Sequence, residues 1–197
     1  MIGPTAYTHP KGTVTFSDYE LALLQLGYAI TDDTQVTLTG LPPVGTERIL
    51  VLDITLKSTL YRGGRVHIAA LGSTSGIAAK EVGVIGVGRV GGVVQLCLAR
   101  DCESSLSLSS NMTLAGVMLM LNGATGIFRV GRTTSLLAEL DTLLPLSKDA
   151  GEINGGLASG GVRFGWTNWG LDLVLMRVLG SSPVTLPFIA LTYRSEP

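Results

Sequence analysis

Short stretches in which apolar and polar residues alternate run along most of the chain. In residues 48–57, one face holds Leu50, Leu52, Ile54 and Leu56 at every second position, and the other face holds Asp53, Thr55 and Lys57. Successive side chains of a β-strand point to opposite faces, so this period of two is typical of a strand. The same pattern returns in residues 65–69, 93–98, 113–121, 171–178 and 184–193. The alternation therefore predicts at least six strands, and about eight when weaker stretches are included.

Residues that favour tight turns separate these stretches. They occur at Gly63–Gly64, Gly91–Gly92, Asn122–Gly123, Asn154–Gly156, Gly160–Gly161 and Gly180–Pro183. Such combinations reach the positive φ angles that hairpin turns need. Strands do not alternate with long helical patterns, which disfavours a parallel sheet with crossover helices. We expect an all-β fold, an antiparallel β-sandwich or barrel, with one or two short helices in its connections.

Two segments are candidates for those helices. Ser17–Glu20 forms a capping-box pattern, and Leu21, Leu24 and Tyr28 follow it at helical spacing. The alternative is a strand at residues 13–16 followed by a loop. Residues 136–144, which end before Pro145, fit a helix or a strand equally well, and the pattern leaves that choice open.

The composition favours an assembled protein. About 46% of the 197 residues are hydrophobic, 15% are charged, and the mean hydropathy is +0.42. So few polar side chains leave apolar surface uncovered, which predicts contacts with partner chains. We interpret residues 1–197 as a single domain, with residues 1–12 as an extended N-terminal arm. This arm lacks the pattern of a signal peptide, and no uncharged segment reaches the roughly 20 residues of a membrane helix.

The charge distribution argues against autonomous nucleic-acid binding. The formal net charge is −1, and the basic residues are scattered singly. Two pairs, Arg62 with Arg65 and Arg129 with Arg132, come nearest to a basic patch. We identify these four residues as candidate contacts to RNA or to a partner chain, the alternative being solvated loop charges.

Motifs that indicate catalysis are incomplete. Gly86–Gly91 matches the G-x-G-x-x-G fingerprint, but a β-branched stretch follows it where a helix should begin, so we interpret it as a glycine-rich hairpin. Residues 72–76 resemble a nucleophile elbow with Thr74 at its centre, yet both histidines precede it. The carboxylate pairs Glu139/Asp141 and Asp32/Asp33 do not stand out from the background. We therefore expect no enzyme, no metal and no cofactor.

The cysteines and tryptophans give weaker hints. Cys97 and Cys102 lie five residues apart, and we expect two free thiols in a reducing compartment rather than a disulfide. Trp166 and Trp169 form the one concentration of large aromatic residues, in residues 164–170. Interface anchors are the favoured interpretation, and a stacking platform for sugar or RNA is the alternative.

The strand order and turn chemistry resemble those of the small coat protein of comovirus- and fabavirus-type plant viruses. The turn Tyr61–Gly64 before the strand Arg65–Ile68, and the loop 166–169 before strands 171–178 and 187–194, carry this resemblance. It implies a jelly-roll β-sandwich that assembles with a larger partner coat protein into an icosahedral shell. It also implies location in a virion assembled in the host cytoplasm, indirect contact with viral RNA, and no contact with a membrane.

Two other function classes stay open. A β-sandwich ligand-binding module, or a phage tail or decoration protein, would use Trp166, Asn168 and Trp169 as the rim of its site. An enzyme would need a centre built from His67 and Asp53, the one credible pair of catalytic residues in the chain.

Overall fold

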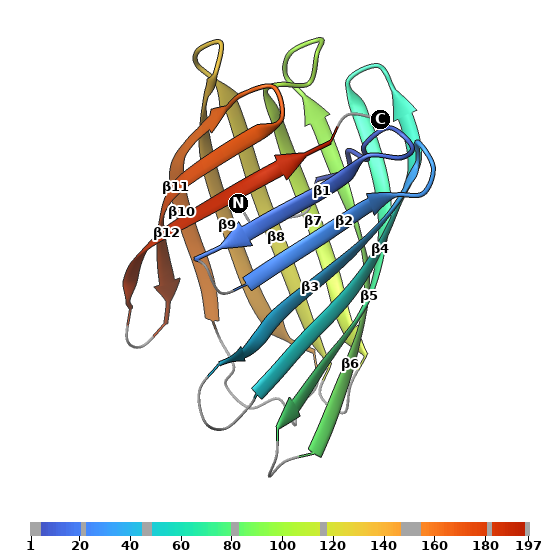
Figure 1. Ribbon diagram of the computed structural model, residues 1–197, viewed down its shortest axis with the longest axis vertical. Coiled ribbons are helices and arrows are strands. Elements are labelled where there is room, and N and C mark those ends of the chain that lie inside the picture. Colours follow the sequence, from blue (N-terminus) through green and yellow to red (C-terminus); the bar gives the residue numbers. More distant parts are fainter. Residues whose placement is uncertain are drawn as a thin grey trace.

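The computed structural model describes residues 5–20, 23–44, 49–79, 83–114, 118–146, 155–180 and 183–195. These residues form twelve antiparallel strands that close into one barrel, in which each strand pairs with its neighbours in the sequence and β1 pairs with β12. Figure 1 shows blue β1 lying between β2 and red β12. The strands are β1 Val14–Tyr19, β2 Leu23–Ala29, β3 Thr34–Val44, β4 Ile49–Gly63, β5 Val66–Ala79, β6 Gly83–Cys97, β7 Ser105–Leu114, β8 Leu119–Arg129, β9 Thr134–Pro145, β10 Gly155–Gly165, β11 Trp169–Leu179 and β12 Thr185–Arg194.

The two rims of the barrel differ. The terminal rim carries both ends of the strand sequence and the connections 30–33, 64–65, 98–104, 130–133 and 166–168. The opposite rim lies where β1, β3, β5, β7, β9 and β11 end. Strand lengths are uneven, because β1 and β2 have 6 and 7 residues whereas β4 and β6 have 15 each. The wall is therefore lowest at β1 and β2.

The jelly-roll β-sandwich is wrong, because the sheet closes on itself instead of folding into two layers. The expected helix after Ser17 is also wrong: Ser17 lies in β1, and Leu24 and Tyr28 lie in β2, whose outward positions include both of them. The undecided segment 136–144 is part of strand β9. No helix among the described residues is long and apolar enough to cross a membrane.

Several glycine pairs lie where no turn occurs. Gly63–Gly64 does mark a turn, with Gly64 at a φ of 54°. In contrast, Gly91–Gly92, Asn122–Gly123 and Gly160–Gly161 lie within β6, β8 and β10, and Asn154 lies outside the described residues. The Gly86–Gly91 motif lies within β6, so it is neither a hairpin nor a nucleotide-binding turn. The predicted strand 113–121 belongs to two strands, β7 and β8.

Some of these glycines are required by the approach of neighbouring backbone. A Cβ atom on Gly161, which points into the barrel, would lie 2.3 Å from the carbonyl oxygen of Leu173. A Cβ atom on Gly72, which points outward from β5, would meet nothing within 4 Å. The two positions therefore provide a matched pair for the same substitution.

We expect Gly161→Ala to lower the free energy of unfolding by more than about 1 kcal/mol, because backbone must move to admit the methyl group. Gly72→Ala should stay within about 0.5 kcal/mol of the parent chain. Urea unfolding followed by tryptophan fluorescence measures both. Equal effects of the two substitutions would show that the close approach at Gly161 is not a packing constraint.

Candidate functional site in the barrel interior

The polarity of the barrel wall is inverted relative to a water-soluble protein. Large apolar side chains point outward and are exposed, among them Leu52, Ile54, Leu106, Leu108 and Leu173. Among the described residues, buried polar side chains outnumber buried apolar ones. The alternation seen in the sequence is therefore real, but its polar face is the inner one.

The interior is lined mainly by hydroxyl, amide and charged side chains. They include Thr15, Ser17, Gln25, Gln35, Thr37, Thr39, Asp53, Thr55, Lys57, Thr59, Ser73, Ser75, Arg89, Gln95, Ser105, Ser107, Thr125, Glu139, Asp141, Ser159, Arg163, Asp172 and Thr192. Many bond across strands. The Tyr19 hydroxyl donates to Gln25 Oε1 at 3.1 Å, and Gln25 Nε2 donates to Thr39 Oγ1 at 3.1 Å.

Two ion pairs compensate interior charges. Arg163 and Asp172 face each other on β10 and β11, with both donor–acceptor distances 2.6 Å in a bidentate arrangement. Arg89 of β6 pairs with Asp53 of β4, and its Nε donates to Ser73 Oγ at 3.0 Å. The guanidinium groups of Arg163 and Arg89 are therefore each paired with a carboxylate on another strand.

The residues before β1 enter the barrel. The side chains of Ala6 and Thr8 are 0% and 1% exposed. Lys57 Nζ donates to the carbonyl oxygens of Thr5, at 3.3 Å, and Tyr7. The backbone N–H of Tyr7 donates to Gln95 Oε1 at 3.2 Å. We call residues 5–9 the inner segment; it lies against the inner wall of β4, β5 and β6.

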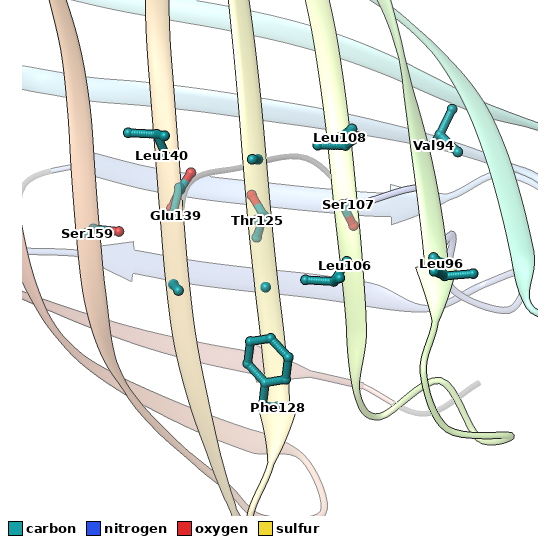
Figure 2. Close-up of a pocket in the computed structure, with 13 residues that line it drawn as sticks. Val94, Leu96, Leu106, Ser107, Leu108, Thr125, Phe128, Glu139, Leu140 and Ser159 are labelled. Atoms are coloured by element: carbon teal, nitrogen blue, oxygen red, sulfur yellow. The ribbon is translucent and has the colours of Figure 1, made fainter.

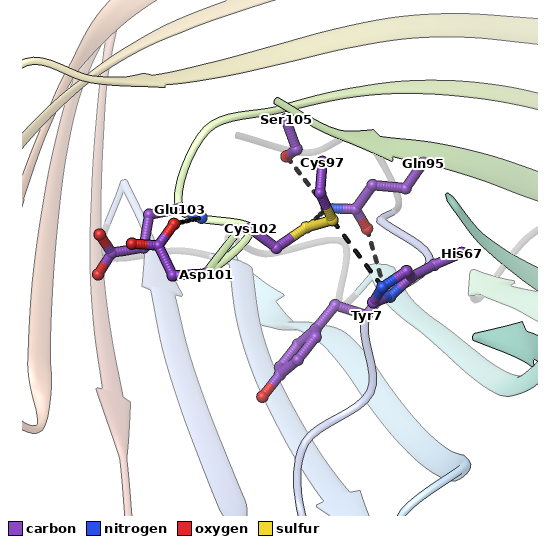
Figure 3. Close-up of a disulfide and its surroundings, with 8 residues drawn as sticks. All are labelled: Tyr7, His67, Gln95, Cys97, Asp101, Cys102, Glu103 and Ser105. Atoms are coloured by element: carbon purple, nitrogen blue, oxygen red, sulfur yellow. Dashed lines mark hydrogen bonds between the residues drawn. A yellow bond between two sulfur atoms is a disulfide. The ribbon is translucent and has the colours of Figure 1, made fainter. Parts of the chain in front are cut away.

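A disulfide lies beside the inner segment (Figure 3). Cys97 ends β6, and the turn 98–104 brings Cys102 back to it, with Leu98 N–H donating to Ser104 O at 2.8 Å. The expectation of two free thiols is therefore wrong, because sequence spacing does not show that the turn reverses the chain. Gln95, which binds Tyr7, also donates to Ser105 Oγ at 3.0 Å, so one amide joins this turn to the inner segment.

The four candidate arginines all lie at the terminal rim. Arg62 is the last residue but one of β4, where it donates to Thr8 Oγ1 and the carbonyl oxygen of Asp32 and lies 3.4 Å from Asp33. Arg129 ends β8 and binds Glu103 and the carbonyl oxygens of Gly131 and Arg132. Arg65 and Arg132 lie in turns. Contact of these arginines with a partner chain stays a prediction.

The tryptophans belong to a larger aromatic group at the same rim. Trp166 lies in the turn 166–168, and Trp169 begins β11 and contacts Tyr193 with ring centroids 4.8 Å apart and ring planes tilted by 53°. Of the eleven aromatic residues (five Tyr, four Phe and two Trp), eight lie in that turn or at outward positions within three residues of a terminal-rim strand end. We call these eight the aromatic girdle: Phe16, Tyr28, Tyr61, Phe128, Phe164, Trp166, Trp169 and Tyr193. An anchoring role for both tryptophans stays a prediction.

His67 and Asp53, the candidate centre of an enzyme, lie far apart on the barrel wall. Asp53 pairs with Ser75 of β5, whereas His67 lies eight residues earlier on β5, about 27 Å along the strand. Glu139 and Asp141 share the inner face of β9, and Asp32 accepts from the N–H of Lys11 at 2.8 Å. The described residues hold no group of His, Cys, Asp and Glu suited to a metal ion. That the protein is not an enzyme stays a prediction.

A groove of about 480 Å³ lies over strands β6–β9 (Figure 2). Its sides are outward-pointing residues, including Leu106, Leu108, Phe128 and Leu140, and its floor holds Ala124 and Gly126. The lining also includes Thr125 and Glu139, whose side chains point into the barrel. The groove therefore belongs to the apolar outer surface.

Comparison with known proteins agrees with this geometry. Similar solved structures include the KdgM porin, with a TM-score of 0.67 and 8% identity over 92% of this chain and 98% of that one. The KdgM porin in complex with disordered oligogalacturonate gives 0.64 and 9% identity over 92% and 96%. LpxR from Salmonella typhimurium gives 0.57 and 12% identity over 92% and 99%. No protein-family model matches the sequence, and no curated protein does.

The chain has the fold of the KdgM porin. At identities this low the likeness establishes the fold alone. It overturns the viral coat protein, because a closed twelve-stranded barrel is not a jelly roll. The expected location in a virion is wrong for the same reason. The expected coat-protein and RNA partners and the expected absence of membrane contact are also wrong. The alternative of a β-sandwich ligand-binding or phage module does not fit a closed barrel either.

Removing the disulfide should loosen the turn 98–104. Replacing both Cys97 and Cys102 by serine is expected to lower the free energy of unfolding by about 2 kcal/mol, the loop-entropy value for so short a loop. Urea unfolding measures the change, and reduction of the parent chain should shift its midpoint equally. An unchanged midpoint in both experiments would contradict a stabilising disulfide.

Docking of the inner segment should depend on pH through His9. Burial, together with the nearby Lys57 and Arg194 charges, lowers the pKa of His9 from 6.5 to about 4. Above pH 6.5, His9 is neutral in both the docked and the undocked segment. As the pH falls from 6.5 toward 4, His9 becomes protonated in the undocked segment but stays neutral in the docked one, so docking weakens.

Hydrogen exchange at the Tyr7 amide, corrected for intrinsic rate, measures this effect. Protection should fall between about pH 7.5 and about pH 4.5. His9→Gln keeps a polar side chain that does not titrate, and it should remove most of the pH dependence. The same pH dependence in His9→Gln would assign the effect to another group.

Proposed function

We propose that this protein is an outer-membrane β-barrel that forms a narrow pore for small polar solutes. The observation that carries the proposal is the inverted wall, apolar outside and polar inside, on a sheet without edges. In hydrocarbon every backbone polar group needs a partner within the protein, which a closed barrel provides. In water the same outer surface would promote aggregation.

The aromatic girdle and the disulfide support this location. Aromatic residues gather where a transmembrane barrel crosses the membrane–water interface, and the girdle follows the terminal rim. Its presence at that rim supports a membrane–water interface there. The disulfide between Cys97 and Cys102 fits an oxidising compartment such as the bacterial periplasm.

The interior favours small polar solutes over a polyanion. One similar structure holds the KdgM porin with oligogalacturonate. In this chain Arg89 and Arg163 are each paired with a carboxylate, so neither is available to line a track of positive charge. We therefore do not extend that ligand to this protein.

Insertion is tested with vesicles that contain lipids brominated at different depths. We expect bromines near the headgroups to quench tryptophan fluorescence most strongly, because Trp166 and Trp169 both lie at the terminal rim. The variants Trp166→Phe and Trp169→Phe assign the signal to each residue. Equal emission in brominated and unbrominated vesicles would contradict insertion.

Pore formation is tested by conductance in planar bilayers. We expect stepwise currents, because polar side chains line the interior and the Arg163 and Asp172 charges compensate each other. Asp172→Asn leaves the Arg163 charge uncompensated and should shift the reversal potential toward anion preference, whereas the double variant Arg163→Gln, Asp172→Asn should return it. The absence of ionic current across a bilayer that contains inserted protein would refute the pore.

A further inference from the structure

The inner segment is bound mainly through its backbone. Lys57 donates to the carbonyl oxygens of Thr5 and Tyr7, and Thr59 Oγ1 donates to that of Ala6 at 3.2 Å. Gln95 accepts from the Tyr7 N–H at 3.2 Å. Contacts to consecutive main-chain groups recognise an extended polypeptide whatever most of its side chains are.

Two positions add side-chain selectivity. Ala6 is fully buried and packs with Ala69, Leu71 and Val93, so a larger side chain would have to displace these neighbours. Packing there is apolar, in an interior that is lined mainly by polar side chains. A residue of small size is therefore required at this position.

Thr8 supplies the second selective position. Its hydroxyl donates to the carbonyl oxygen of Asp32 at 2.6 Å and accepts from Arg62, and the residue is 1% exposed. A valine of the same shape would leave the guanidinium and the carbonyl without this partner. The position therefore selects a hydroxyl residue.

The connection to β1 holds the segment beside its site. Lys11 is exposed and lies in a turn with Gly12, whose φ is 88° and whose N–H donates to the carbonyl oxygen of Ala29 at 2.9 Å. A segment tethered this closely has an effective concentration of about 1 mM or more at its site. Modest intrinsic affinity is then enough for occupancy.

We propose that the inner wall of β4–β6 is a binding site for an extended peptide with a small residue at the position of Ala6 and a hydroxyl residue at that of Thr8. The inner segment fills this site in cis and narrows the pore. Only the narrowing rests on the proposed pore function; peptide binding does not.

The experiment uses the full chain with a specific protease sequence inserted after Lys11, where the backbone is exposed. The protein is folded first and cut afterwards, so that residues before the cut become a separable peptide. Cutting and dilution should open the pore to a larger conductance. A synthetic peptide of residues 5–11, at about 1 mM, should return the conductance of the uncut protein.

Variants of peptide and wall test the contacts. Peptides with Ala6→Trp or Thr8→Val should lose the block, and Lys57→Met in the wall should weaken it, with Lys57→Arg retaining it. Ser159→Ala, on the opposite wall, is the control that should leave the block unchanged. In the uncut chain Ala6→Trp should give the open conductance directly.

Fluorescence anisotropy of labelled peptide with the cut protein in detergent separates the two proposals. Peptide binding without any conductance would contradict the proposed pore function and support the peptide-binding site. An open pore that binds neither parent nor variant peptide would overturn the peptide site, and a conductance that cutting and dilution do not change would overturn the narrowing.

Discussion

The pairing of β1 with β12 is the constraint on which the rest of the structure depends. Five residue pairs, from Thr15 with Arg194 to Tyr19 with Ala190, join the first strand to the last. The N–H of Ser195 donates to the carbonyl oxygen of Val14 at 2.9 Å and extends the seam. Without this seam the sheet would have two edges, whose unpaired backbone groups would each cost several kcal/mol in hydrocarbon.

Closure also explains how an interior can be polar. The outer face buries apolar side chains against whatever surrounds the barrel, so the inner face is free to hold hydroxyl, amide and charged groups. These polar groups need hydrogen-bond or ion-pair partners inside the barrel. Arg163 and Asp172 pair with each other across neighbouring strands, whereas Lys57 and Gln95 bind the inner segment, which enters from the terminal rim. The inner segment and the ion pairs therefore satisfy the same requirement by different means.

The strands were largely predictable and their arrangement was not. A period of two identifies residues 48–57 as a strand, but it is the same whether the apolar face meets a core or a lipid. The alternation leaves a sandwich or a barrel open, and the resemblance to a coat protein selects the jelly-roll sandwich. The high hydropathy is interpreted as contact surface for partner chains. The aromatic girdle is visible in the sequence only after strand ends are known, because its members, such as Tyr28 and Phe128, are far apart in the chain.

Other errors had local causes. Glycine pairs within β6, β8 and β10 look like turns, yet at Gly161 glycine is needed because Leu173 of the next strand is close. Lys57 contacts Thr5 and Tyr7, which lie 52 and 50 positions away in the chain. No sequence pattern predicts contacts between residues so far apart.

In the proposed outer-membrane location, the short strands β1 and β2 have a consequence for the surrounding bilayer. A transmembrane strand needs about 9–11 residues, and β1 and β2 have 6 and 7. Lipid beside them must thin to match, at a modest cost for each ångström of mismatch. Asp18 of β1 points outward at this place, with its Oδ1 lacking a hydrogen-bond partner among the described residues. A thinned leaflet would bring water and headgroups down to this carboxylate, so the lowest part of the wall would draw the membrane surface toward it.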